Sequence, residues 1–333
     1  MKSEEAGQVR REERMAVAAE VQTLTARIRE LAARKNAVIL AHNYQVGEVQ
    51  DAADFVGDSL GLSQEAARSR ADLIVFCGVH FMAETASILA PSKKVLLPDL
   101  EAGCSLSDTL TEAQLRAWKE KYPGAAVVTY VNTSAAVKAL SDYCCTSSNA
   151  VKVVESIPAE REILFGPDMF LGAFVSRTTG RKNLHLWAGE CHVHAAVRPE
   201  DIERARSAHP EADFLIHPEC GCVTSCMVYV KDRDVRPEKA HILSTEGMVR
   251  HVAASPESEF VVATETGILH RMKKLAPGKT FVPVSDEMEC KYMKMITLEK
   301  LLRSLEEEIY EVKVAPEVAE RARLPIERMI SIC

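Results

Sequence analysis

The sequence of 333 residues has little that would place it on a nucleic acid or in a membrane. Its formal net charge is −7, and lysine and arginine form no local cluster that could follow a phosphate backbone. No apolar run approaches the roughly 20 residues that a membrane-spanning helix needs. Residues 2–34 are rich in arginine and glutamate and read as a polar helical extension, so we expect no secretion signal there. We therefore expect no nucleic-acid partner, no membrane contact and a cytoplasmic location.

The glycine-rich segments that bind nucleotides are also absent. No Gly-x-Gly-x-x-Gly occurs, and Gly278-Lys279-Thr280 has Lys273 where a phosphate-binding loop needs its first glycine. The segment from Gly57 to Gly61 matches the Gly-x-Ser-x-Gly of a nucleophile elbow, but residues 49–56 read as helix, and that elbow must directly follow a strand. We therefore expect the Ser59 hydroxyl to bind an anion near the start of a helix.

The chain has ten cysteines and no Cys-x-x-Cys pair of the kind that structural zinc sites use. In a reducing compartment, metal binding or catalysis is a better explanation for cysteines than a disulfide framework. Three positions read as buried apolar fillers: Cys77, the pair Cys144-Cys145, and Cys333. A dense group formed by Cys220, Cys222 and Cys226 beside His217 could bind a metal or form a local disulfide, and the sequence assigns it no role.

Short apolar strands alternate with helical stretches, which predicts an α/β fold with parallel sheets. The pattern occurs three times, with three expected strands in each unit. The strands are expected over residues 37–41, 72–76 and 94–97, over 125–130, 163–166 and 185–187, and over 213–217, 260–263 and 280–284. Helices are expected between them, for example over 48–68, 81–89, 147–156 and 246–253.

The spacing of chemically active residues supports a true repeat. One such residue ends the first strand of each unit: His42, Tyr130 and His217. One cysteine follows the third strand of each unit: Cys104, Cys191 and Cys290. The first set is separated by 88 and 87 residues and the second by 87 and 99, which leaves room for an insertion in the third unit. A period this long indicates repeated domains, because solenoid units are shorter.

Ligands of parallel sheets bind beyond the carboxyl ends of the strands. Three units around a pseudo-threefold axis would direct all their strand ends, with three cysteines, to one centre. One lone cysteine per unit fits a shared iron–sulfur cluster better than structural zinc. The strand ends also carry His, Tyr, Asn and Glu, which suit proton transfer and carboxylate binding, although each alone is more often an ordinary polar residue.

Several ordered segments are similar to the quinolinate synthase family, iron–sulfur enzymes of NAD biosynthesis. The similarity runs from about Ala37 to Leu302. The matching segments are Ala41-His42-Asn43-Tyr44-Gln45, Gly57-Asp58-Ser59-Leu60, Phe76-Cys77-Gly78-Val79-His80, Gly103-Cys104-Ser105-Leu106, Tyr130-Val131-Asn132-Thr133, Gly189-Glu190-Cys191-His192-Val193-His194, His217-Pro218-Glu219-Cys220, and Ser244-Thr245-Glu246-Gly247-Met248.

This resemblance implies three similar α/β domains around a pseudo-threefold axis, with the active site at the centre. The expected division is a helical extension over 1–35, repeats over 36–120, 121–208 and 209–296, and a helical segment over 297–333. The implied enzyme is a transferase that condenses iminoaspartate with dihydroxyacetone phosphate to quinolinate, with loss of phosphate and two waters. An aspartate-oxidising enzyme would supply iminoaspartate.

The resemblance also implies roles for residues. It makes Cys104, Cys191 and Cys290 the ligands of a 4Fe-4S cluster, whose fourth iron is left open as a Lewis acid. It implies catalytic roles for Tyr44, Glu219 and His194. It implies that substrate is bound by His42, Ser59, Tyr130, Asn132, Ser147, His217, Ser244 and Thr245. Some family members carry two further cysteines before the third ligand, but Val284 and Glu287 stand there in this chain, so a redox switch at that place is not implied.

Two other functions remain open from the residues. One is a different cluster-dependent hydro-lyase, which would share the open iron but act on another hydroxy acid. The other is a cluster-carrying redox or sensor protein without a substrate. The His, Tyr, Asn and Glu at the strand ends count against a pure electron carrier, which would not need them.

Overall fold

The computed structural model describes residues 2–222 and 237–332, and its strands form three four-stranded parallel sheets. The first sheet has the order β2-β1-β3-β4, and its strands are β1 (Ala37–His42), β2 (Phe55–Gly57), β3 (Leu73–Cys77) and β4 (Lys94–Leu96). The second has the order β6-β5-β7-β8, with β5 (Ala126–Tyr130), β6 (Tyr143–Cys145), β7 (Ile163–Gly166) and β8 (Leu184–Leu186). The third has the order β10-β9-β11-β12, with β9 (Asp213–Ile216), β10 (Ala240–Ile242), β11 (Glu259–Ala263) and β12 (Thr280–Pro283).

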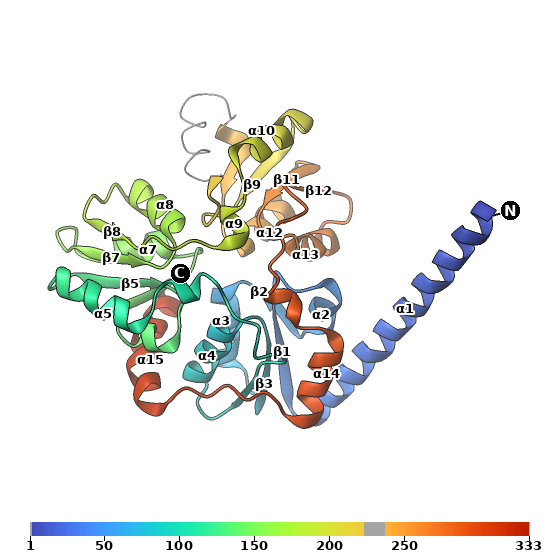
Figure 1. Ribbon diagram of the computed structural model, residues 1–333, viewed down its shortest axis with the longest axis horizontal. Coiled ribbons are helices and arrows are strands. Elements are labelled where there is room, and N and C mark those ends of the chain that lie inside the picture. The colour runs from blue at the N-terminus through green and yellow to red at the C-terminus, as the bar shows by residue number, and fades with distance from the viewer. Residues whose placement is uncertain (1, 223–236, 333) are drawn as a thin grey trace.

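The identical strand order in the three sheets confirms the predicted fold class of three similar α/β units. In Figure 1 the three sheets and their helices form three lobes around a common centre. The central strands β1, β5 and β9 are apolar and buried in their C-terminal halves, as strands covered on both faces must be.

The prediction of three strands per unit was wrong, because each unit has a fourth, three-residue strand: β2, β6 and β10. Short length alone does not explain why they were missed, because β4 and β8 also have three residues and were predicted. The helix expected over 48–68 is in fact α2 (Gly47–Ala52) and α3 (Ser59–Arg68), with β2 between them. The stated reason for rejecting a nucleophile elbow at Ser59 was therefore also wrong, since a strand does precede it. The elbow is still excluded, because among the described residues only Asn36 and Glu308 combine a side chain with positive φ, so Ser59 lacks the strained turn.

The remaining helices cover the sheets and connect the units. Those of the first two units are α4 (His80–Leu89), the 3₁₀ turn η1 (Ser107–Thr109), α5 (Glu112–Lys121), α6 (Ala135–Lys138), α7 (Ala150–Glu155) and α8 (Met169–Thr179). Those that follow β8 are α9 (His192–Ala195), α10 (Pro199–Ala208), the 3₁₀ turn η2 (Pro237–Lys239), α12 (Thr245–Ala254), α13 (Ile268–Leu275) and the 3₁₀ turn η3 (Met293–Met295).

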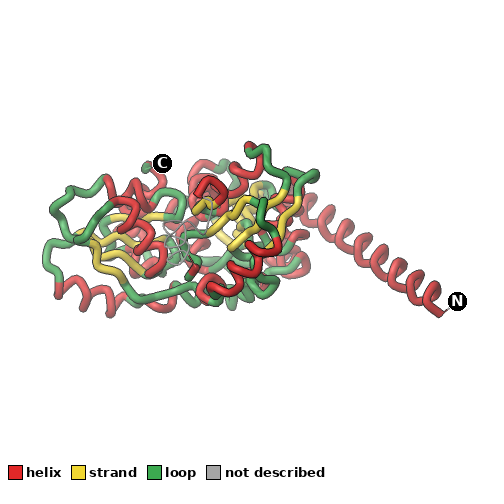
Figure 2. Tube along the Cα trace, turned by 90° about the horizontal axis from the view of Figure 1, so that it is seen from above, coloured by secondary structure: helices red, strands yellow, loops and turns green. Residues whose placement is uncertain are grey.

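Three further helices come from the two ends of the chain. Helix α1 (Lys2–Arg34) projects from the body in both views, and its last turns pack on α14 (Leu298–Glu307) with Ile28 and Leu31 buried (Figures 1 and 2). Helix α15 (Pro316–Ser331) packs against β6, α6 and α4, and so it joins the second unit to the first.

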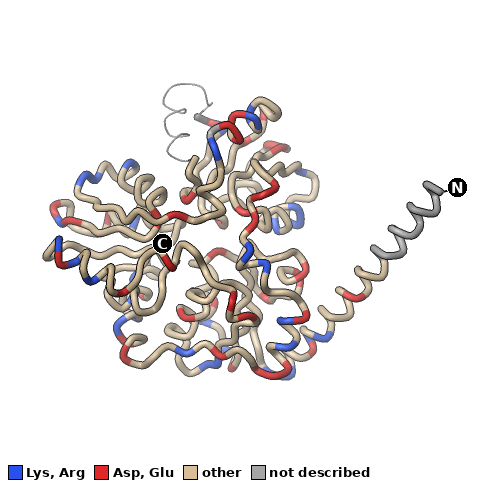
Figure 3. Tube along the Cα trace, in the orientation of Figure 1, with Lys and Arg blue, Asp and Glu red and all other residues tan. Residues whose placement is uncertain are grey.

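Charged residues of both signs are distributed along the chain, as its composition leads one to expect. Acidic and basic residues are interspersed along the chain in Figure 3. A search of the described residues finds no helix that is both long and apolar enough to cross a membrane.

Candidate active site

The carboxyl ends of the strands surround one cavity of about 680 Å³, including its mouth. Thirteen of the fourteen predicted site residues line it. They are Cys104, Cys191, Cys290, Tyr44, His194, Glu219, His42, Ser59, Tyr130, Asn132, Ser147, His217 and Thr245. The exception is Ser244, which lies next to the lining residue Thr245 and is buried at the start of α12. Residues from all three units therefore share one cavity, as the strand ends predict.

The three cavity cysteines occupy equivalent backbone turns. In each unit the cysteine carbonyl oxygen accepts a hydrogen bond from the amide four residues later, at Asp108 (3.2 Å), Ala195 (2.8 Å) and Lys294 (3.2 Å). Each sulfur also faces the amides two and three residues later, which are those of Leu106 and Ser107, of Val193 and His194, and of Tyr292 and Met293. One local structure thus presents a sulfur to the cavity three times.

These turns suit sulfur that carries negative charge. Burial raises the pKa of all three thiols, that of Cys104 to about 12, so an unliganded thiol there stays protonated. Amide groups directed at the sulfur stabilise a thiolate once a metal has displaced the proton. All three cysteines are free of disulfide bonds. The donor set and its surroundings therefore fit an iron–sulfur cluster.

A smaller group of possible metal ligands overlaps this set. The ligand atoms of Cys191, His194 and Glu219 lie within 4.8 Å of one another. A single ion bound there would leave Cys104 and Cys290 without a role, although their equivalent turns face the same cavity. The threefold arrangement therefore favours a shared cluster over a mononuclear site.

His42 and His217 form equivalent turns at the ends of the first strands of their units. The Nδ1 atom of His42 accepts a hydrogen bond from the amide of Tyr44 at 3.2 Å, and Nδ1 of His217 accepts one from the amide of Glu219 at 3.4 Å. Burial lowers the pKa of both imidazoles to about 3, so both are neutral near pH 7. With Nδ1 as acceptor, each Nε2 carries the proton, and that of His217 lies 3.2 Å from Ser147 Oγ. Both rings are thus neutral hydrogen-bond donors.

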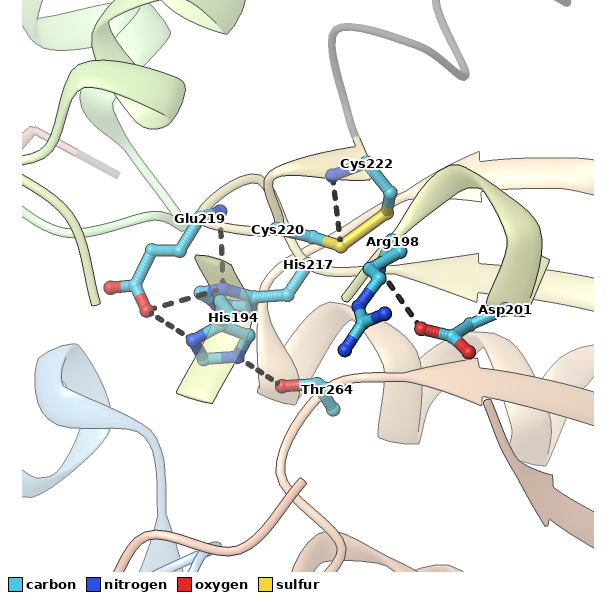
Figure 4. The surroundings of a disulfide bond; sticks show 8 residues. All are labelled: His194, Arg198, Asp201, His217, Glu219, Cys220, Cys222 and Thr264. Carbon is cyan, nitrogen blue, oxygen red and sulfur yellow. Dashed lines mark hydrogen bonds and ion pairs between the residues drawn. A yellow bond between two sulfur atoms is a disulfide. The ribbon is translucent and has the colours of Figure 1, made fainter. Parts of the chain in front are cut away.

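A chain of hydrogen bonds connects Tyr44 to Glu219. The Tyr44 hydroxyl lies 2.6 Å from Thr264 Oγ1, which lies 2.9 Å from His194 Nε2. On the other side of the ring, Nδ1 lies 3.0 Å from Glu219 Oε2 (Figure 4). The tautomer with its proton on Nδ1 satisfies every group, because Tyr44 then donates to Thr264, Thr264 to His194, and His194 to Glu219. The two predicted acid/base residues are therefore linked.

Glu219 is the anionic centre of this network. Burial opposes its ionisation, but His217, His194 and Tyr130 favour the carboxylate and hold its pKa below the usual range. Because His217 is itself neutral, the hydrogen bond from His194 carries much of this effect. The second oxygen, Oε1, is buried without a hydrogen-bond partner, as is Oδ1 of Asn132. Buried acceptors in a cavity without protein donors are suited to a ligand that supplies donors.

The second strand of each unit leads into a helix whose first turn faces the centre, and one network joins these starts. The Ser148 hydroxyl donates to Asp58 Oδ2 at 2.5 Å and lies 2.9 Å from Ser244 Oγ. Asp58 and Ser244 in turn cap α3 and α12 by accepting from the amides of Gly61 and Gly247. Ser244 thus orders the wall beside Thr245. Ser59 begins α3 at the cavity, as expected of a residue near a helix start.

The sequence argument missed Glu265, which lines the cavity, and also Thr264 and Lys294, which contact lining residues. Glu265 is fully buried, accepts from the amide of Cys290 at 3.1 Å and pairs with Lys294 at 2.7 Å. Lys294 also donates to the Tyr44 carbonyl at 2.6 Å, which ties the third cysteine turn to the first unit. Thr264 and Glu265 directly follow β11, so the strand-end argument could have found them had it been applied to every strand.

The cysteine-rich segment after Glu219 contains a disulfide bond between Cys220 and Cys222 (Figure 4). Both cysteines are buried in an apolar cluster of the third unit, and Cys191 and Cys290 pack against the same cluster. The prediction that a local disulfide could form here is therefore confirmed for this pair, while Cys226 lies outside the described residues.

Comparison with a family model and comparison with individual proteins both give the same family. The family model for quinolinate synthetase A protein matches residues 26–331. The quinolinate synthase of Thermus thermophilus is 57% identical over 311 residues, which cover 93% of this chain and 98% of that protein. The quinolinate synthase of Mycobacterium tuberculosis is 55% identical over 307 residues, covering 92% of this chain and 88% of that protein.

These matches include every segment from which the cavity is built. The chain therefore belongs to the quinolinate synthase family.

Proposed function

We propose that this chain condenses iminoaspartate with dihydroxyacetone phosphate and releases quinolinate, phosphate and two waters. The observation that supports this most is a single cavity combining three equivalent cysteine turns with a linked Tyr–Thr–His–Glu chain. An electron carrier needs the cysteines alone. A condensation followed by dehydrations needs proton transfer at several atoms, which the linked side chains can provide.

The family implies an iron–sulfur cofactor, and we propose a 4Fe-4S cluster on Cys104, Cys191 and Cys290. When bound by three cysteines, such a cluster supplies a Lewis acid at the iron that has no protein ligand. The residues of the chain then do the rest. His194 and Glu219 border the cysteine turns, since His194 Nδ1 also lies 3.3 Å from Cys191 Sγ.

We propose that Glu219 is the base that removes a proton from carbon during isomerisation of the ketose phosphate. Its carboxylate is kept ionised by its neighbours, and its free oxygen is buried in the cavity. Tyr44 is the acid/base group at the other end of the chain. Burial and the charge of Glu219 raise its pKa well above 10, so it holds its proton and acts first as a donor.

We propose that the substrate carboxylates and phosphate are bound by neutral donors. His42, Tyr130 and His217 donate from the first strands, and Ser59, Ser147 and Thr245 lie at or near helix starts. Asn132 provides an amide. Neutral donors bind dianionic substrates without producing an ion pair too strong for product release.

Iminoaspartate hydrolyses readily in water because it is an imine, so an aspartate-oxidising enzyme is the proposed source. We place the reaction in the cytoplasm, where accessible thiols stay reduced, and the disulfide between Cys220 and Cys222 is buried. No nucleic-acid partner is proposed for a chain of net charge −7.

The test is an anaerobic assay with the two substrates, with quinolinate measured as product. The Ala variants of Cys104, Cys191 and Cys290 should each lose the cluster absorbance and activity, while Cys222→Ala should keep its iron. An intact cluster without product would contradict the proposed reaction. Loss of iron in Cys222→Ala but not in Cys290→Ala would contradict the ligand assignment.

A further inference from the structure

A second group of metal-binding side chains lies in the third unit, outside the cavity. Asp213 is the first residue of β9, His241 lies in β10, and His251 is in the last turn of α12. Strand β9 runs from Asp213 to Ile216 and His217 follows it, so Asp213 lies at the opposite end of the strand from the cavity, roughly 13 Å along the chain at about 3.3 Å per residue. None of the three residues lines the cavity.

The three side chains converge on one point. Oδ2 of Asp213 lies 3.0 Å from Nε2 of His251 and 3.5 Å from Nε2 of His241. The two imidazole rings are 4.0 Å apart between centroids, and the three ligand atoms all lie within 4.8 Å of one another. The Asp213 side chain is 5% exposed and each histidine 25%, so the group is reachable from solvent.

Hydrogen bonding accounts for only part of this arrangement. His251 and Asp213 form an ordinary hydrogen bond. By contrast, Nε2 of His241 is buried without a hydrogen-bond partner, although it lies beside the same carboxylate oxygen. A buried nitrogen without a partner costs about 1–3 kcal/mol, and such a group calls for a specific explanation.

We propose that Asp213, His241 and His251 form a binding site for a divalent transition metal ion of the zinc class. Two imidazole nitrogens and a carboxylate oxygen are a common zinc donor set, with water as the fourth ligand. Tetrahedral zinc with bonds near 2.0 Å separates its ligand atoms by roughly 3.3 Å, close to the two distances from Asp213. The ion would supply the missing partner of His241.

The charges around the group permit such an ion. Lys239 Nζ lies 3.9 Å from the other Asp213 oxygen, which weakens cation binding, but Glu257 pairs with Lys239 at 3.2 Å and offsets its charge. Lys239 also donates to the carbonyl of Glu211 at 2.8 Å, so its ammonium group is held by three oxygen partners.

The bound ion would have a structural role: it would hold together β9 and α12, which border the cavity at their other ends. Helix α12 begins beside the cavity at Thr245 and has His251 in its last turn beside Asp213, while β9 begins at Asp213 and ends at Ile216, next to the cavity residue His217. An ion bridging Asp213 and His251 would therefore fix the far ends of two elements whose near ends carry substrate-binding residues. It takes no part in the chemistry.

The test is equilibrium dialysis of the cluster-containing enzyme against Zn²⁺, followed by metal analysis of zinc and iron per chain. The wild type should hold one more zinc than His241→Asn or His251→Ala at the same iron content. His209→Ala is the matched control, because His209 lies in the same unit and pairs with a single carboxylate, Glu259, at 2.8 Å. It should bind as much zinc as the wild type.

X-ray absorption at the zinc edge provides a readout that is independent of activity. The zinc that the wild type binds and the histidine variants lack should, in the wild type, have only nitrogen and oxygen neighbours at about 2.0–2.2 Å. Equal zinc content per chain in the wild type and His241→Asn would contradict the proposed site. Sulfur neighbours around the zinc that is present in the wild type and missing from the variants would also contradict it. If His251→Ala does not fold, His241→Asn decides alone, since the Nε2 atom that it removes has no hydrogen-bond partner.

Discussion

Thr264 shows how one side chain can determine the chemistry of residues distant in the sequence. It lies 220 positions from Tyr44 and 70 from His194, yet its hydroxyl contacts both. The hydroxyl accepts from one and donates to the other, and this fixes which nitrogen of His194 carries the proton. A residue that is not itself an acid or a base can in this way determine the tautomer of a histidine in the cavity.

Replacing Thr264 by Val should therefore lower kcat by about 100-fold, the lower limit of what positioned acid–base groups contribute, with a smaller effect on KM. Thr264→Ser keeps the hydroxyl and should restore most of the activity. The measurement is steady-state kinetics at matched iron content. A valine variant with near-normal kcat would show that the chain from Tyr44 to Glu219 is not used.

His42 should make the stability of the protein depend on pH. Its pKa is about 3 when folded and 6.5 ordinarily, so between these values the unfolded chain binds a proton that the folded protein does not. Its contribution is therefore complete above pH 6.5 and is lost as the pH falls toward 3, with a slope of up to about 1.4 kcal/mol per pH unit.

Urea unfolding of iron-free protein at several pH values between 6.5 and 4.5 measures this slope. The slope should be smaller in His42→Asn by up to about 1.4 kcal/mol per unit. Parallel curves for wild type and His42→Asn would contradict the low pKa.

At the scale of secondary-structure elements, the N-terminal ends of three helices are joined by hydrogen bonds. Helices α3, α7 and α12 come from different units, and Asp58, Ser148 and Ser244 join their first turns in one network. Partial positive charge at helix starts suits anionic substrates, and the network keeps the starts together. The three short strands that lead to these helices were the elements missed by periodicity, so the sequence argument also missed this symmetry.

Ser148→Ala removes the donor to Asp58, a carboxylate only 6% exposed. The free energy of unfolding should fall by about 1–3 kcal/mol, because the carboxylate loses a hydrogen bond that water cannot readily replace. Ser156→Ala is the matched control, since that hydroxyl only donates to the Val153 carbonyl at the other end of α7. Denaturant unfolding of both variants measures the difference, and equal losses would argue against the network.

At the scale of the whole molecule, helix α15 holds the first two units together. Arg323 donates to the Ile88 carbonyl of the first unit, and Arg328 donates to the Asp142 carbonyl of the second at 2.6 Å. Asn149, just before α7, donates to the carbonyls of Met329 and Ile332, both at 2.8 Å. The cavity walls therefore depend on a helix that contributes no residue to the cavity.

Ile326 is fully buried in this helix, whereas Leu324, an isomer two residues away, is 53% exposed. Ile326→Ala should lower the free energy of unfolding by about 2–5 kcal/mol, through the loss of apolar burial and the cavity left behind. Leu324→Ala should change it by less than about 0.5 kcal/mol. Thermal and urea unfolding measure both, and similar values would contradict the packing of α15.

Local sequence patterns were sufficient to predict the central strands and several residues of the cavity. The central strands β1, β5 and β9 were predictable because continuous apolar runs bounded by polar residues read as buried strands. The residues His42, Tyr130 and His217 follow from them, since carboxyl ends of parallel strands are where ligands bind. The domain boundaries and the individual residue roles stay predictions, because no measurement described above tests them.

The sequence by itself determined the α/β class, the threefold repeat and the cavity cysteines, because each is written in local order and regular spacing. Only the tertiary structure decided which neighbours those residues have. Thr264 between Tyr44 and His194, Ser148 between Asp58 and Ser244, and the cluster of Asp213, His241 and His251 all join elements separated along the chain. Their contacts depend on how sheets and helices pack, and no periodicity in the sequence encodes that packing.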